Sequence, residues 1–150
     1  MKKQTFDSAL RSTWQSVSKM YNKEAAKFDS TMATGFALLS IDPEGTPATA
    51  LGPKMGMEST SLSRLLKSME TRGLIERLPN PDDGRGVLIH LTNFGKEKRN
   101  YSREVVLAFN QRVTDQLNTT EIENFYKVVN CIRELSAEFE LNLAAVEEKN

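Results

Sequence analysis

A chain of 150 residues has the length of one domain, and we expect residues 1–150 to form one. Its 20 basic and 20 acidic side chains cancel, so the net charge predicts neither a nucleic-acid nor a membrane partner. One cysteine, Cys131, excludes an intrachain disulfide and favours a reducing, cytoplasmic compartment. The N-terminus lacks the apolar segment of a signal peptide, and no apolar run approaches the roughly 18 residues of a membrane span.

The charges are distributed unevenly along the chain. Residues 1–53 hold six basic and five acidic side chains, residues 54–103 hold ten and six, and residues 104–150 hold four and nine. A basic middle segment beside an acidic end indicates that one face of the molecule meets an anion. Such an uneven distribution of charge also arises by chance, so it supports an anion-binding face only together with motifs in the same segment.

The first segment, Phe6 to Phe28, predicts a long helix. Its apolar residues recur at steps of three and four, which places them in one stripe. A shorter helix is expected from Met32 to Ile41, and Asp42-Pro43-Glu44-Gly45 ends it with turn chemistry. The stripe of the first helix consists of Phe6, Leu10, Trp14, Val17, Tyr21, Ala25 and Phe28.

The middle of the chain predicts a helix-turn-helix. Residues 48–57, ATALGPKMGM, supply a short first helix with a tight turn at Gly56, and Glu58 to Arg72 supply a second helix. Gly52-Pro53 fits the first helix poorly, because proline is tolerated only in the opening turn. This helix therefore either starts late, near Leu51, or is bent.

The second helix has a narrow apolar stripe and a polar face that suits DNA. Short hydroxyl side chains near its N-terminus let the helix approach a phosphate closely, and cations one turn further reach a base edge or a phosphate. The alternative is an ordinary surface helix with serines near its cap. The candidate DNA-binding residues of this helix are Ser59, Thr60, Ser61, Ser63, Arg64 and Lys67.

A β-hairpin is expected after this helix. Leu74–Leu78 and Val87–Leu91 are strand candidates, and residues 79–86, PNPDDGRG, join them with Asp83-Gly84 as the reversal. Thr92 is expected to cap the following helix. Helix, turn, helix and hairpin follow each other in the order of a winged helix-turn-helix. Alternation places one apolar face of the second strand on Val87, Ile89 and Leu91.

Two further helices are expected towards the C-terminus. Apolar residues from Val105 to Leu117 mark the first, Asn118-Thr119-Thr120 breaks it, and Glu121 begins the second with Thr119 as its cap. The second helix repeats apolar residues about every 3.5 positions, which is typical of a helix seam. Its stripe consists of Ile122, Phe125, Val129, Ile132, Leu135, Phe139, Leu143 and Val146.

The helices at the two ends, about residues 4–29 and 96–148, have more apolar stripe than a small module at about 30–95 can cover. We expect them to pair with each other and with a second copy in a homodimer. The alternative is a monomeric helical bundle. The expected dimer-interface residues are Phe6, Leu10, Trp14, Ile122, Phe125, Val129, Ile132 and Phe139.

These features resemble the MarR family of bacterial transcriptional regulators. The match runs through residues 59–96, STSLSRLLKSMETRGLIERLPNPDDGRGVLIHLTNFGK, and its most specific part is Asp83-x-Arg85 followed by VLIHLT and Gly95. The resemblance implies a mainly α fold with a small β-hairpin, a winged helix-turn-helix flanked by long dimerisation helices. It places Arg85 in the minor groove, with Asp83 as the acid that braces it. Many family wings carry a second basic residue where this chain has Gly84.

The resemblance also implies a function. A family member acts as a homodimer on a pseudo-palindromic operator in double-stranded DNA, most commonly as a repressor. Many relatives are released by a small aromatic ligand, whereas aromatic residues at helical spacing are more often core. The residues that would line such a ligand site are Trp14, Tyr21, Phe36 and Phe109.

Other functional classes find little support in the sequence. With one histidine and one cysteine far apart, no nucleophile–base pair of an enzyme is indicated. His90 alone cannot hold a metal, so neither a metal nor a cofactor is expected, and Cys131 is expected to be a buried, inert thiol. The remaining alternative is a winged helix used only for protein–protein assembly, without DNA binding.

Overall fold

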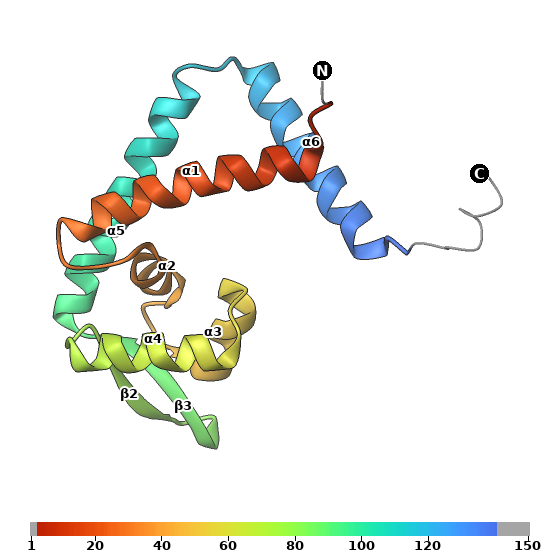
Figure 1. Cartoon of the computed structure of the whole chain (residues 1–150). Coiled ribbons are helices and arrows are strands. Elements are labelled where there is room, and N and C mark those ends of the chain that lie inside the picture. The colour runs from red at the N-terminus through yellow and green to blue at the C-terminus, as the bar shows by residue number, and fades with distance from the viewer. Residues whose placement is uncertain (1–2, 141–150) are drawn as a thin grey trace. The chain divides into compact units, whose positions relative to one another are not determined.

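The computed structural model describes residues 3–140, and it consists mainly of helices with a small three-stranded antiparallel sheet (Figure 1). A boundary after Val106 divides the chain into two compact units. That residues 1–150 act as one domain stays a prediction. The elements in chain order are α1 (Phe6–Ala26), α2 (Met32–Ser40), β1 (Thr46–Pro47), α3 (Ala48–Met55), α4 (Ser59–Thr71), β2 (Ile75–Asn80), β3 (Asp83–Leu91), α5 (Asn93–Thr114) and α6 (Thr119–Glu138).

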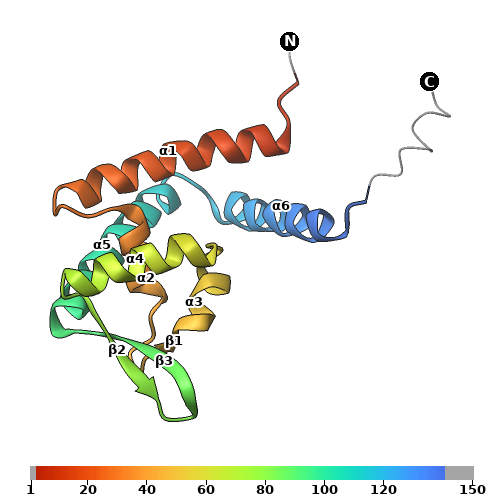
Figure 2. The same ribbon diagram turned by 60° about the horizontal axis from the view of Figure 1, so that its bottom comes forward.

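The expected fold class is confirmed, because a helix-turn-helix is followed by a two-stranded hairpin and a long helix. The short strand β1, which the sequence did not reveal, pairs with β3 and completes a sheet of order β1-β3-β2. Figure 2 shows β2 and β3 projecting from the helices as a hairpin, with β1 beside β3 at its base.

The first helix of the helix-turn-helix does not start late. Of the two alternatives, a start near Leu51 is wrong, because α3 starts at Ala48, and Pro53 lies inside it, in the last turn. Proline there has no N–H to donate, and the helix ends within a few residues. Gly56 follows in the left-handed conformation at φ 64°, so the tight turn expected at this glycine is confirmed.

The core of the first unit fixes the orientation of α4. Leu62, Leu66 and Met69 occupy one side of this helix and are buried against residues of α2, α3 and the hairpin. Burial of each such side chain contributes about 1.5–3 kcal/mol, which holds the apolar stripe inward and turns the polar face outward. The other core residues are Ala37, Leu38, Ile41, Leu51, Leu74, Ile75, Ile89 and Leu91.

The hairpin differs from the sequence-based expectation at its tip. Both strands are longer than predicted, and Asn80 pairs with Asp83, so Pro81 and Asp82 make the reversal in place of Asp83-Gly84. Because Pro79 pairs with Val87, residues 84–86 form a bulge with no partners on β2.

The apolar face of β3 is only partly buried. Ile89 and Leu91 are buried, as their alternation predicted, but Val87 is 37% exposed. Val87 lies past the end of the core, where the hairpin extends away from the helices, so period-two alternation alone overestimates its burial.

The C-terminal helices depart from the prediction at their ends. The cap of α6 is Asn118, whose side chain forms a capping box with Glu121, so the helix begins at Thr119, and Thr119 is not the cap. The helix ends at Glu138, so Phe139 follows it as the C-cap. Leu143 and Val146 lie outside the described residues.

The α6 surface is exposed in the single chain. Phe125 is 58% exposed, and Cys131 is exposed as well, so the expectation of a buried thiol is wrong for this chain. The thiol is exposed because α6 has no buried residues in the single chain, and even the stripe residue Leu135 is exposed. Within residues 3–140, no helix combines the length and the apolar character that crossing a membrane requires.

Candidate nucleic-acid interface

The outward face of α4 carries hydroxyls at its N-terminal end and cations one turn further. All six side chains predicted to contact DNA from this helix are exposed. Neither Arg64 nor Lys67 has an ion pair with any residue between positions 3 and 140. An outward cation without a protein partner is available for a phosphate or a base edge.

The N-terminus of α4 has no side-chain cap. Glu58 is the N-cap residue, but its carboxylate accepts no hydrogen bond from the first turn. The free backbone N–H groups of an uncapped helix terminus favour an anion such as a phosphate. Ser59, Thr60 and Ser61 surround these groups with small hydroxyl side chains, which leave room for a close approach.

The tip of the hairpin presents Arg85 on the bulge. Asp83 Oδ1 accepts a hydrogen bond from the Arg85 backbone N–H at 3.1 Å. A Cβ on Gly86 would lie only 3.1 Å from Asp83 Oδ2, so the carboxylate folds closely over the backbone of the bulge. Asp83 therefore braces the backbone of Arg85, while the exposed Arg85 side chain has no ion pair among the described residues.

An ion pair connects α4 to the hairpin. Arg77 Nε on β2 donates to Glu70 Oε2 on α4 at 2.7 Å. Sequence reasoning missed this pair, because residues seven positions apart on a helix and a following strand have no spacing rule that brings them together.

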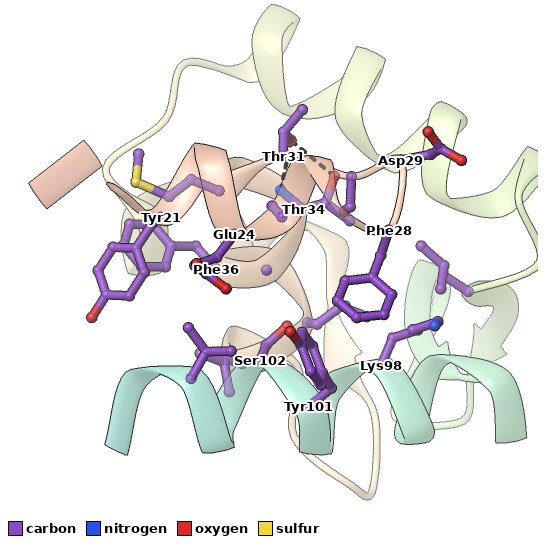
Figure 3. A pocket seen from close by; sticks show the side chains of 18 of the residues that line it. Tyr21, Glu24, Phe28, Asp29, Thr31, Thr34, Phe36, Lys98, Tyr101 and Ser102 are labelled. Carbon is purple, nitrogen blue, oxygen red and sulfur yellow. Dashed lines mark hydrogen bonds between the residues drawn. The ribbon is translucent and has the colours of Figure 1, made fainter. Parts of the chain in front are cut away.

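The same unit contains a cavity of about 230 Å³. It lies between residues of α1, α2, the end of α4 and the first part of α5, with Tyr101, Ser102 and Lys98 of α5 on one wall (Figure 3). Tyr21 and Phe36, which the sequence singled out, line the cavity. Trp14 does not line it, but it stacks on Phe36 with ring centroids 6.1 Å apart. Phe109 belongs to the second unit and does not line the cavity.

Of the charged side chains that line this cavity, Glu24 has an ion-pair partner, whereas Lys98 contacts aromatic rings. Glu24 is held by Lys27 at 2.8 Å, and this hydrogen bond raises the pKa of Lys27 above its usual value. Lys98 lies over the rings of Phe28 and Phe94, at 5.1 and 5.4 Å from their centroids. These aromatic faces hold its ammonium group beside the cavity without neutralising it. The sequence-based reasoning missed Phe28, Lys98, Tyr101 and Ser102 as lining residues, because the segment after α1 meets α5 only in the folded chain.

Sequence comparisons place this chain among known regulators. A model of the MarR family matches residues 35–87. The transcriptional regulator SarZ of Staphylococcus saprophyticus is 31% identical over 113 residues, which cover 71% of this chain and 77% of SarZ. The multiple antibiotic resistance protein MarR of Escherichia coli is 31% identical over 111 residues, with 72% of this chain and 76% of MarR covered.

The chain belongs to the MarR family.

Solved structures agree with membership of the MarR family. A mutant MarR of E. coli in complex with operator DNA has a TM-score of 0.73 and 25% identity, covering 83% of this chain and 90% of that one. The MepR–DNA complex of S. aureus has a TM-score of 0.78 and covers 90% of this chain and 99% of that one. At 21% identity, this second likeness concerns the fold alone.

Membership of the MarR family also defines the class of function. SarZ and further relatives are named as transcriptional regulators, so this chain is a MarR-family transcriptional regulator and not an enzyme. In this chain, α3 and α4 form the helix-turn-helix, and β2 and β3 form the hairpin. The roles of individual residues on these elements stay predictions.

Proposed function

We propose that this MarR-family protein binds double-stranded DNA sequence-specifically and represses transcription. The observation that carries the proposal is that α4 and the hairpin tip present Arg64, Lys67 and Arg85 outward, each without an ion pair among the described residues. A helix with such a face suits the major groove, and an arginine on a narrow hairpin suits the minor groove. The E. coli MarR mutant of similar fold was solved with operator DNA, which supports this assignment.

We propose further that the functional unit is a homodimer. Large apolar side chains on α1 and α6, including Phe6, Trp14 and Phe125, are exposed in the single chain, and so is Phe139 at the C-cap of α6. A second copy that covers them removes this apolar surface from water. Two recognition helices in successive major grooves, about 34 Å apart, then read a pseudo-palindromic operator.

The cavity supports a third element of the proposal, an effector site for a small aromatic anion. Tyr21, Phe28 and Phe36 supply aromatic surface, and Lys98 and Arg72 supply positive charge. Arg72 is also the C-cap residue of α4, so an occupant of the cavity contacts the end of the recognition helix. Trp14 supports this wall through its stacking on Phe36, and we assign no contact with the ligand to Phe109.

Selection of random duplex DNA by the purified protein tests the proposed function. The expected result is enrichment of a pseudo-palindromic sequence, whose affinity falls steeply as the salt concentration rises. The rival function, a winged helix used only for protein assembly, predicts no enriched sequence. That rival function requires neither Arg64 nor Arg85 for DNA binding.

A further inference from the structure

The ion pair between Glu70 and Arg77 lies where the hairpin leaves the body of the first unit. Arg77 pairs across the strands with Ile89, and residues paired in this way share a face of the sheet. One step towards the core on this face, Ile75 and Leu91 are buried. One step towards the tip, Val87 is exposed. The pair therefore marks the border between the buried and the projecting part of the hairpin.

Beyond this border, the hairpin has few links to the rest of the molecule. The side-chain hydrogen bonds described for residues 79–87 join Asn80 to Asp82 and Asp83 to Arg85, and both lie within the tip. Among residues 3–140, the bond from Arg77 to Glu70 is thus the outermost polar side-chain link between the hairpin and the recognition helix.

We infer that Glu70 and Arg77 are positioning residues that set the wing relative to the recognition helix. The inference rests on the proposed DNA-binding function, because it concerns the simultaneous reading of a major groove by α4 and a minor groove by Arg85. The hairpin extends about 10 Å beyond Arg77, so a rotation of about 10° at this point displaces the tip by about 2 Å. In a minor groove about 6 Å wide, such a displacement is enough to move Arg85 from a favourable contact into a steric clash.

The strength of the pair limits the effect. Its side chains are 38% and 48% exposed. An ion pair that is this exposed shifts the equilibrium between the placed and the displaced wing by a factor of about five at most. Breaking it should leave the fold intact and reduce the fraction of molecules with a correctly placed wing. We expect a two- to fivefold loss of DNA affinity on this basis.

Glu70→Gln gives the sharpest test, because two explanations predict opposite signs. Removal of a negative charge near DNA strengthens binding if only net charge matters. Removal of the positioning pair weakens binding. Glu76→Gln is the matched control, since Glu76 is exposed on β2 next to Arg77 and has no ion pair among the described residues.

The experiment measures fluorescence anisotropy with a labelled duplex that the wild-type protein has selected from random-sequence DNA. Glu70→Gln should weaken binding two- to fivefold, Glu76→Gln should not weaken it, and both melting temperatures should stay close to that of the wild type. In an Arg85→Ala background, Glu70→Gln should cause no further loss, because the wing no longer has a contact to position.

Two results would overturn the inference while leaving the proposed function in place. One is that Glu70→Gln binds as tightly as the wild type or more tightly. The other is that it weakens binding equally with and without Arg85, which indicates a general structural effect. If the wild type itself selects no duplex, both the inference and the proposed function are wrong.

Discussion

The Cα of Gly95, in the first turn of α5, lies against the carbonyl oxygen of Leu74, and a Cβ on Gly95 would overlap that oxygen. The same carbonyl accepts a hydrogen bond from the Thr92 backbone N–H at 3.1 Å. Thr92 Oγ1 in turn accepts from the Gly95 N–H at 3.0 Å, which confirms Thr92 as the predicted cap. This junction joins the end of the recognition-helix segment to the start of α5.

Gly95→Ala is therefore expected to destabilise the protein. The overlapping atom belongs to the backbone and cannot move aside as a side chain does, so we expect a loss of about 2–3 kcal/mol. Thermal denaturation should show a melting temperature lower by about 5–10 °C. Gly84→Ala is the matched control, since a Cβ at Gly84 meets nothing within 4 Å. Equal melting temperatures for the two variants would contradict the packing described for Gly95.

Arg64 and Lys67 are expected to contribute differently to DNA binding. If Arg64 contacts a base edge, Arg64→Ala costs about 1–3 kcal/mol and relaxes specificity at one position of the operator. If Lys67 contacts a phosphate, Lys67→Ala weakens binding to all DNA sequences alike. It also reduces the steepness of the plot of the logarithm of the association constant against the logarithm of the salt concentration by about one. Anisotropy titrations on selected and scrambled duplexes measure both effects. Lys19→Ala, on the exposed side of α1, should change neither, and unchanged binding by both α4 variants would refute the interface.

Arg85→Ala tests the wing. An arginine favours a narrow, A·T-rich minor groove, so its loss should weaken binding by about 1–2 kcal/mol on a duplex with A·T-rich flanks and by less on G·C-rich flanks. Arg103→Ala removes the same charge from an exposed position on α5 and serves as the control. Identical losses for both arginine variants on both duplexes would show that charge alone acts, and the minor-groove role would be wrong.

The cavity prediction concerns Lys98. Benzoate is a suitable probe of the proposed site for a small aromatic anion, and at ten times its dissociation constant it should stabilise the protein by about 1.4 kcal/mol. Lys98→Gln should reduce this stabilisation, because it removes the positive charge beside the cavity. Lys96→Gln is the control, since Lys96 is exposed on the same helix and does not line the cavity. An equal benzoate response in all three proteins would exclude the assigned role of Lys98.

Local patterns in the sequence predicted the elements that depend on near neighbours. The stripe of Leu62, Leu66 and Met69 and the glycine turn at Gly56 follow from helix periodicity and backbone sterics, which act over a few residues. The predicted cap at Thr92 has the same local origin. These features sufficed to predict the winged helix-turn-helix.

The features that the sequence did not reveal depend on contacts between distant residues. β1 consists of two residues and exists because it pairs with β3 more than forty positions later. The reversal lies at Pro81 and Asp82 rather than at Asp83-Gly84, because the register shifts between Pro79, which pairs with Val87, and Asn80, which pairs with Asp83. The cavity wall formed by Phe28 and Tyr101, with ring centroids 4.4 Å apart, likewise joins the segment after α1 to α5.

The central claim is that this chain binds DNA through the cations on α4 and the wing. The most direct measurement is the affinity of the wild-type protein for its selected duplex across a series of salt concentrations. We predict that the logarithm of the association constant falls linearly with the logarithm of the salt concentration, with a slope that reflects several phosphate contacts. A slope near zero, or equal affinity for selected and scrambled duplexes at every concentration, would contradict the claim.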